Sequence, residues 1–340
     1  MIKKWSIFLL IILASLASFW QVICGPEVDG LKDLYDISQG KIPKILFAYR
    51  KNGVNQIYTG QIDGSNIQPI LVPADLHPQQ PRFFHNTKKV LFMTVLRSND
   101  TEKRMRSELY KINLDGTSLQ KIELRGEMLI IEAIPSLDNQ SIYLISSGAI
   151  THYSPLVKAM PHEMDIYAFD LRTKSLNKLT NYSSYDLNSL YQPDGTHLYF
   201  HSSDAMHQSA PFGLLNLKTS QVKFFSLSKR EAPITTTPGF GDEEIIWGPS
   251  RISPDGESII YIKPATRGSF HYELFNLNIA AKTSAQLTDL KSVVTSPIFF
   301  DNGTKIAFLK EMAWPQRGNP YDLMVVNADG SGLTKIILQV

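Results

Sequence analysis

Two strand–turn–strand patterns alternate along this chain, and their repetition limits the fold more than any other feature. In the first pattern two apolar strands flank a tight turn, and it occupies residues 81–94, 135–146, 189–201, 250–262 and 296–309. The second pattern is an alternating strand, another turn and a short apolar strand, at residues 57–71, 109–124, 166–180, 213–227, 274–288 and 323–338. One copy of each makes four short strands. Six such units predict an all-β fold, a six-bladed β-propeller of four-stranded antiparallel blades.

The turns of the first pattern carry Asn86, Asp138, Asp194, Asp255 and Asp301 at equivalent places. Asp-Gly and Asn-Gly suit tight hairpins because glycine adopts a positive φ, while the Asp or Asn side chain bonds nearby backbone amides. We therefore predict that these side chains shape turns rather than bind a ligand. The strands, such as residues 259–261, are apolar at successive positions, which predicts sheets buried on both faces between neighbouring blades.

The first blade lacks a clear copy of the first pattern. Residues 36–40, before the apolar run at residues 45–47, form a degenerate copy. If this assignment is right, every blade consists of contiguous chain and the ring closes by packing of blade one on blade six. Otherwise blade one is short, or residues 26–40 contribute to the last blade. We favour the first arrangement.

The first pattern resembles the repeat of TolB-like propellers, in which Ser-Pro-Asp-Gly joins two apolar strands and the second strand ends in an aromatic residue. Residues 253–256, Ser-Pro-Asp-Gly, with Ile259, Ile260 and Tyr261, match this repeat fully, and residues 192–195 and 300–303 match in part. The resemblance covers residues 36–340 and implies a propeller domain of residues 25–340. It implies little about function, because one fold serves many functions.

Proteins with this repeat often carry a second domain. TolB has a separate α/β domain before its propeller, whereas only about 20 residues lie here between the N-terminal apolar segment and the first strand. In prolyl-oligopeptidase-type enzymes a hydrolase domain accompanies the propeller, but this sequence has no G-x-S-x-G nucleophile elbow. We therefore expect a stand-alone propeller.

The charge balance excludes two classes of partner. The net charge is +2, and Lys3 and Lys4 supply it, so the rest of the chain carries 32 basic and 32 acidic residues. A balanced chain lacks the basic footprint of a nucleic-acid binder. It also lacks a long basic run that would hold the domain on anionic lipid.

Residues 1–24 differ from the rest, with two lysines followed by an apolar run at residues 5–23. This order is typical of a secretory signal, and Ser15 and Ala17 offer a cleavage site just before Ser18. The run is also long enough to remain as a membrane anchor, which would be the only membrane contact. Cys24, the only cysteine, resembles a lipoprotein processing site, although the residues before it fit poorly. All three interpretations predict an exported protein, periplasmic or secreted.

We expect function at the end of the ring that carries the long loops. Second-to-third loops and interblade links share one end of antiparallel blades, and here they cover residues 97–107, 147–164, 202–212, 228–246, 264–271 and 310–321. Binding residues concentrate in such loops on a rigid scaffold. The candidate binding residues in or beside them are His152, Tyr153, His162, Glu163, Asp165, His201, Asp204, His207, Trp247, His271 and Trp314.

Five of these residues, His152, His162, His201, His207 and His271, are also candidate ligands of a divalent metal, the only cofactor that the sequence suggests. Their spacing matches no metal motif, and solvated loop histidines are the simpler explanation. Oligogalacturonate lyases resemble this case because they hold a metal with histidines in a related propeller. Their ligand motif does not match this chain residue by residue.

These observations support two functions from different classes. The first is a non-enzymatic binding or scaffold module of the cell envelope or exterior, with a protein or peptide partner at the long-loop end. The second is a metal-dependent carbohydrate-active enzyme, a lyase or hydrolase, with loop histidines as ligands and a glycan as substrate. The first is favoured, because the sequence contains no complete catalytic motif.

Overall fold

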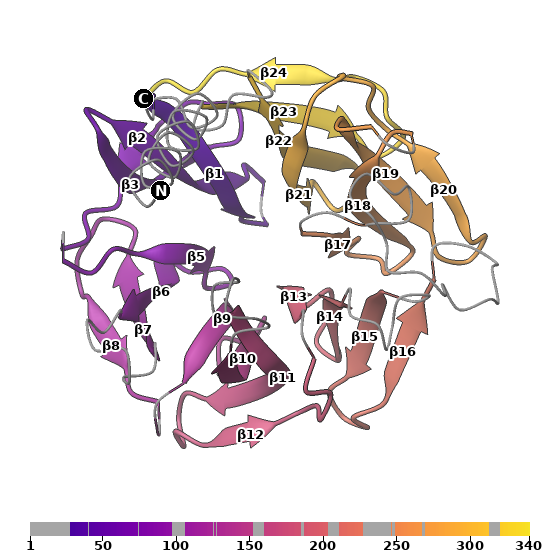
Figure 1. The fold of residues 1–340 in the computed structure, drawn as a ribbon. Helices are drawn as coiled ribbons and strands as arrows, with labels where there is room; N and C mark the ends of the chain where they lie inside the picture. Colours follow the sequence, from indigo (N-terminus) through magenta and orange to yellow (C-terminus); the bar gives the residue numbers. More distant parts are fainter. Residues whose placement is uncertain are drawn as a thin grey trace, which may run out of the picture.

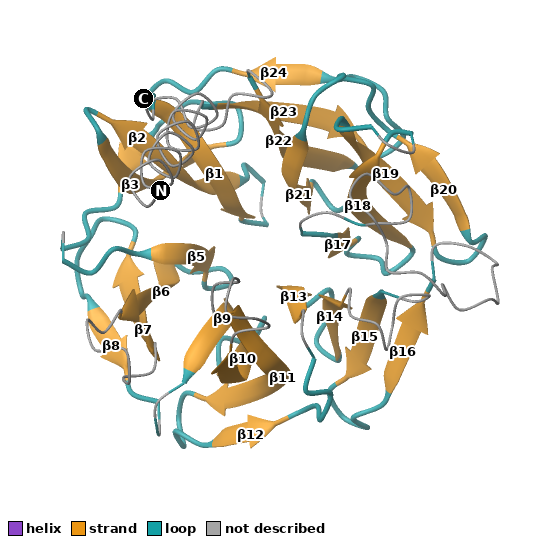
Figure 2. Ribbon diagram, in the orientation of Figure 1, coloured by secondary structure: helices purple, strands orange, loops and turns teal. Residues whose placement is uncertain are grey.

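The computed structural model describes residues 28–340 except residues 40, 74, 97–105, 125, 127, 152–159, 185–186, 203–210, 227–245, 247–248, 267–268 and 313–319. The described residues form six four-stranded antiparallel sheets that stand as blades around a central axis (Figure 1). Strands and connecting loops account for all of this region (Figure 2). No helix within it could span a membrane. The predicted all-β six-bladed propeller is confirmed.

Each blade is one contiguous stretch of chain, and its strands follow one another from the axis outwards (Figure 1). The strands are β1 (Gly30–Ile37), β2 (Lys44–Lys51), β3 (Val54–Gln61) and β4 (Gln68–Pro69) in blade one; β5 (Gln79–Phe83), β6 (Lys89–Leu96), β7 (Arg106–Asn113) and β8 (Gln120–Ile122) in blade two; β9 (Leu129–Pro135), β10 (Ser141–Thr151), β11 (Met160–Asp170) and β12 (Leu176–Lys178) in blade three; β13 (Leu187–Tyr191), β14 (His197–Ser202), β15 (Phe212–Asn216) and β16 (Val222–Phe225) in blade four; β17 (Arg251–Ile252), β18 (Ser258–Pro264), β19 (Tyr272–Asn278) and β20 (Thr283–Gln286) in blade five; and β21 (Val294–Phe300), β22 (Lys305–Glu311), β23 (Tyr321–Asn327) and β24 (Thr334–Ile336) in blade six.

Six hydrophobic clusters lie between neighbouring blades, one at each junction. Strand β18 shows why its sequence is apolar at every position. Ile259 and Tyr261 pack toward blade four, whereas Ile260 and Ile262 pack toward blade six. Successive side chains of a strand point to opposite faces, so a blade buried on both faces needs apolar residues at both. The core of this protein is therefore the set of contacts between blades.

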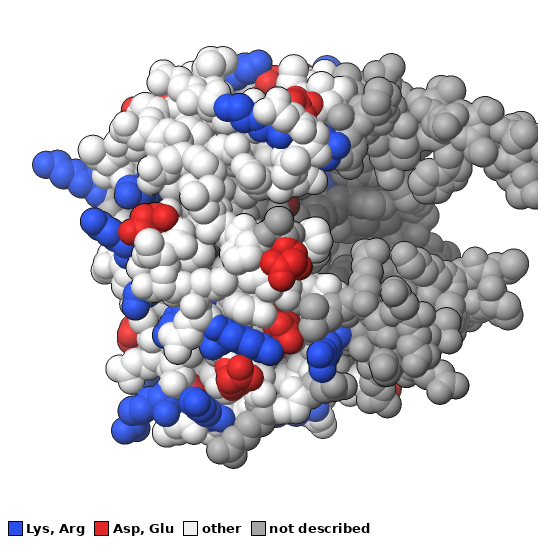
Figure 3. Space-filling view, turned by 90° about the vertical axis from the view of Figure 1, so that its left-hand side faces the viewer, with Lys and Arg blue, Asp and Glu red and all other residues white. Residues whose placement is uncertain are grey.

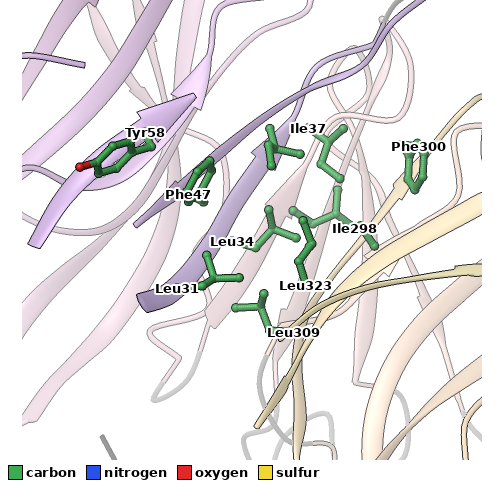
Figure 4. Close-up of a cluster of buried hydrophobic side chains, with 11 residues drawn as sticks. Leu31, Leu34, Ile37, Phe47, Tyr58, Ile298, Phe300, Leu309 and Leu323 are labelled. Carbon is green, nitrogen blue, oxygen red and sulfur yellow. The ribbon is translucent and has the colours of Figure 1, made fainter. Parts of the chain in front are cut away.

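The ring closes by packing of blade one on blade six, as predicted. Leu31, Leu34 and Ile37 of β1 lie against Ile298 and Phe300 of β21 in one buried cluster (Figure 4). Two hydrogen bonds span the same junction. The Ser296 hydroxyl donates to Asp33 at 3.0 Å, and the Gln339 amide donates to the Gly64 carbonyl at 3.0 Å. Blade one therefore has its own first strand, of which the degenerate copy contributes only the last two residues, Asp36 and Ile37. The sheet of blade one contains β1 to β4 and no strand from the other end of the chain.

The turns between first and second strands have the chemistry expected of them. In blade five the Asp255 carboxylate accepts hydrogen bonds from the Ser253 hydroxyl and the Glu257 amide, and Gly256 adopts a φ of 75°. Asp138 accepts the corresponding bonds from Ser136 and Gln140 in blade three. The prediction that these carboxylates shape turns is confirmed at both places.

One long loop is shorter than its sequence suggests. Strands β10 and β11 stay paired beyond the rest of their sheet, to Thr151 opposite Met160. Much of the segment expected as the irregular loop 147–164 is therefore a regular hairpin. Most of the other long loops lie outside the described residues.

Candidate functional site

The predicted site residues divide into two groups. Six lie outside the described residues, namely His152, Tyr153, Asp204, His207, Trp247 and Trp314. The other five lie on three different blades: His162, Glu163 and Asp165 on β11, His201 on β14, and His271 next to β19. No three His, Cys, Asp or Glu side chains of the described region gather in a way that could hold a metal ion.

Asp165 is built into blade three. Its carboxylate is buried and accepts hydrogen bonds from the Thr180 hydroxyl at 2.9 Å and the Tyr182 amide at 2.6 Å. The Lys178 ammonium lies 2.9 Å from its other oxygen. These contacts fasten the segment that follows β12, so Asp165 has a structural role here.

His201 is also enclosed, with 1% of its surface exposed. Its Nδ1 lies 3.2 Å from the Asn188 side-chain oxygen, and its ring is 5.7 Å from that of Phe212. His271 is half-buried, and its backbone bonds to Ser269 and Ala265 within the loop between β18 and β19. These two histidines thus sit in separate surroundings on neighbouring blades.

Two cavities on the axis define a different candidate site, which we call the axial site. The larger one, about 470 Å³, is lined by residues near the starts of the innermost strands, including Lys32, Gln80, Glu132 and Thr295. The smaller one, about 310 Å³, is lined by first-to-second turns, including Asn86. Arg82 and Arg251 line both cavities and therefore lie where they meet.

The innermost strands are irregular where they border the larger cavity. The register with the second strand shifts in β1, β5, β9, β13 and β21, as it does at a β-bulge. Gln80, Ser189 and Ser296 lie in these shifts and adopt positive φ angles of 46°, 65° and 52°. Bulges re-aim side chains, and left-handed non-glycine residues concentrate at functional sites. The irregularity places polar side chains on the axis.

An ion pair ties four blades together at this site. Arg82 of blade two lies 3.0 Å from Glu132 of blade three, and the side chains are only 11% and 8% exposed. Arg82 also donates to the Tyr35 carbonyl of blade one. The second Glu132 oxygen accepts a hydrogen bond from the Leu190 amide of blade four at 3.1 Å. Both charges are buried, paired and further hydrogen-bonded, which is the arrangement that stabilises such a pair.

Two further carboxyl groups of blade one face the axis. Burial raises the pKa of Asp36 above its ordinary value, although Arg82 and the amides of Phe83 and Ile37 lower it. Burial likewise raises the pKa of Asp33, against the opposing hydrogen bond from Ser296. Burial, together with Asp36, raises the pKa of Tyr191 to about 12. Asp36 and Tyr191 line the smaller cavity and Asp33 lines the larger one, and shifted ionisable groups gathered in this way mark the axial site as a candidate functional site.

The surface outside the axis carries mixed charge. On the side formed by blades one and two, lysines and arginines are interspersed with acidic residues (Figure 3). This face shows no single-sign patch, in agreement with the balanced composition.

Comparison with known proteins supports the fold. The sequence matches no protein-family model and no curated protein. Its structure is similar to TolB from Acinetobacter baumannii, with a TM-score of 0.58 and 20% identity over 87% of this chain and 65% of that one. It is also similar to a protein assigned as TolB from Agrobacterium tumefaciens, with a TM-score of 0.54 and 14% identity over 80% and 84% of the two chains. An oligogalacturonate lyase in complex with manganese gives 0.53 and 12%, over 91% and 86%.

The protein is a TolB-like six-bladed β-propeller. At these identities the likeness is one of fold, and the chain spans less than two thirds of the A. baumannii TolB.

Proposed function

We propose that the protein is a non-enzymatic binding module of the cell envelope or exterior, and that a protein or peptide partner inserts a segment into the larger axial cavity. The observation that carries this proposal is the bulged inner wall, which turns polar side chains of several blades toward one cavity. Concave sites with a few convergent polar groups are the usual sites of recognition. The residues that line this cavity lie near the starts of the innermost strands, the end of the ring at which we expect the partner to bind.

Export is the second part of the proposal. Its support is the order of residues 1–24, two lysines followed by an apolar run, which lie outside the described residues. Cleavage before Ser18, retention as an anchor and processing at Cys24 all deliver the propeller to the same side of the membrane.

The metal-dependent carbohydrate-active enzyme is the weaker candidate, with a glycan as its substrate. The likeness to a manganese-bound oligogalacturonate lyase is one of fold. His162, His201 and His271 do not converge, and no His, Cys, Asp or Glu group of the described region suits a metal. We therefore do not propose this function.

Site-specific photocrosslinking in intact cells of the source organism tests the binding module. A benzoylphenylalanine replaces Thr295, which lines the larger cavity, or Thr283, which is exposed on the outer strand β20. We expect a discrete adduct with a non-cytoplasmic protein from position 295 alone, because only that position faces the proposed partner. Adducts with only cytoplasmic proteins would refute export, and identical adducts from both positions, or none from 295, would refute the axial binding site.

A further inference from the structure

Arg251 is a largely buried residue whose guanidinium makes one hydrogen bond among the residues that the structure describes. It lies at the start of β17, is 8% exposed and lines both axial cavities. Its only hydrogen bond within the described region runs from Nη1 to the carbonyl of its neighbour Ser250, at 3.0 Å. A guanidinium carries five N–H donors. The remaining donors of this enclosed guanidinium are available to an acceptor that enters the axial cavities, and a charged hydrogen bond is strong in such a site.

The acidic groups that face Arg251 do not supply that acceptor. Glu132 is held by Arg82 and the Leu190 amide. Both oxygens of Asp36 accept backbone amides, from Ile37 and Phe83, at 2.9 and 2.8 Å. Asp33 accepts the Leu34 amide and the Ser296 hydroxyl. None of the three lies in an ion pair with Arg251, although Glu132 and Asp36 attract it at longer range.

Two effects reduce the repulsion that these acids would exert on an anion. The charge of Glu132 is neutralised by Arg82 at 3.0 Å. Burial raises the pKa of Asp33 and of Asp36, which favours their neutral forms. Arg251 makes no ion pair within 4.0 Å among the described residues, in contrast to Arg82.

Gln80 adds a second observation in the larger cavity. Its side-chain nitrogen donates to the Ile131 carbonyl at 3.0 Å, but its side-chain oxygen is buried and has no hydrogen-bond partner among the described residues. Gln80 adopts a positive φ at the bulge that turns it toward the axis. The site therefore presents unused donors on Arg251 and one unused acceptor on Gln80.

We propose that Arg251 binds the carboxylate of a ligand in the axial site, and that this ligand is the C-terminal end of a peptide chain. A guanidinium matches a carboxylate in a two-pronged pair that is both strong and directional. A peptide end also carries a backbone N–H beside its carboxylate, which suits the free oxygen of Gln80. A slender chain end reaches a residue as enclosed as Arg251 more readily than an internal loop does. This inference rests on the proposed function and names the chemistry that the cavity recognises.

Isothermal titration calorimetry on the full chain tests it with three probes: a pool of N-acetylated tetrapeptides with free C-termini, the same pool amidated, and sodium acetate. We expect the free-acid pool to bind and the amidated pool to bind roughly 10- to 100-fold more weakly, because the charge-assisted pair is lost. Arg251→Met should weaken binding of the free-acid pool by a similar factor. Arg251→Lys keeps the positive charge but not the two parallel N–H donors, and should weaken binding by an intermediate factor.

Lys218→Met is the matched control, since it removes an exposed basic residue far from the axis, in the turn after β15, and should bind as the native protein does. Acetate binding as tightly as the peptides, and lost in Arg251→Met, would assign the site to small free carboxylates and overturn the peptide source. Binding that survives Arg251→Met, or no carboxylate binding at all, would overturn the proposal. Peptide binding without a crosslinked partner would refute the proposed function alone, and a partner without carboxylate binding would refute this inference alone.

Discussion

Replacing Arg82 with Met is expected to lower the free energy of unfolding by about 3–5 kcal/mol. The substitution leaves the Glu132 carboxylate buried, with the Leu190 amide as its remaining partner among the contacts described above. It also removes the hydrogen bond to the Tyr35 carbonyl, so that blades one, two and three lose a shared contact. Urea denaturation followed by circular dichroism measures the effect. The dependence of the unfolding free energy on urea concentration should stay unchanged, which shows that the variant exposes the same surface on unfolding.

Two companion variants sharpen this prediction. Lys121→Met removes a surface ion pair of similar length, 2.9 Å to Glu108, and should lower stability by less than about 1 kcal/mol. Combining Arg82→Met with Glu132→Gln should recover part of the loss, because the uncompensated charge is gone. A loss below about 1 kcal/mol for Arg82→Met would show that the pair does not hold the inner ring together.

Replacing Glu273 with Ala is expected to lower stability by about 3–5 kcal/mol. Its carboxylate is fully buried and accepts the Thr288 hydroxyl at 2.6 Å and the amides of Leu290 and Lys291, both at 2.8 Å. These bonds fasten the link between blades five and six, as Asp165 fastens the segment after β12 in blade three. Differential scanning calorimetry on native and variant protein measures the change.

Glu257→Ala serves as control for that experiment, because Glu257 is an exposed turn residue and its loss should stay within about 0.5 kcal/mol. Glu273→Gln should fall between the two, since one acceptor oxygen remains. Equal melting temperatures for Glu273→Ala and Glu257→Ala would contradict a structural role for this carboxylate.

The fold was predictable because its signals are local. The turn around Asp255 and the apolar strand that follows it each reflect contacts within one hairpin or with the blades on either side. Each of the six repeats can bury its apolar faces only against its neighbours, and a closed ring gives every repeat two neighbours. The degenerate first strand was the hardest element, because its apolar positions Leu31 and Leu34 precede the segment that resembles the repeat.

The axial site was not predicted, because it depends on contacts between distant parts of the chain. Arg82 meets Glu132 only when blades two and three stand side by side, and Arg251 joins them across the ring. A signal was present in the sequence: Glu132 interrupts the otherwise apolar strand β9. Arg82 and Arg251 both lie four residues before the turn residue of their blade, at equivalent positions. An alignment of the six repeats on their turn residues would have placed the two arginines in one column and predicted that both face the axis.

The histidines predicted from the sequence to bind a ligand are not brought together in the described part of the structure. Histidines near long loops suggested a site at one end of the ring, but residues on different blades converge only if their side chains point to the axis. His201 instead lies within blade four beside Asn188 and Phe212. The spacing of residues along the sequence does not reveal which way a side chain points. In the structure, residues that point to the axis lie at the bulges of the innermost strands.

Urea denaturation of Arg251→Met beside the native protein shows whether this arginine is held on the axis for a ligand or for the fold. If it is held for a ligand, we expect a free energy of unfolding within about 1 kcal/mol of the native value, or higher, because a buried charge with one hydrogen bond among the described residues is replaced by an apolar side chain of similar length. A loss of about 3 kcal/mol or more, similar to that expected for Arg82→Met, would instead make Arg251 a structural residue, and the proposed ligand site would be wrong.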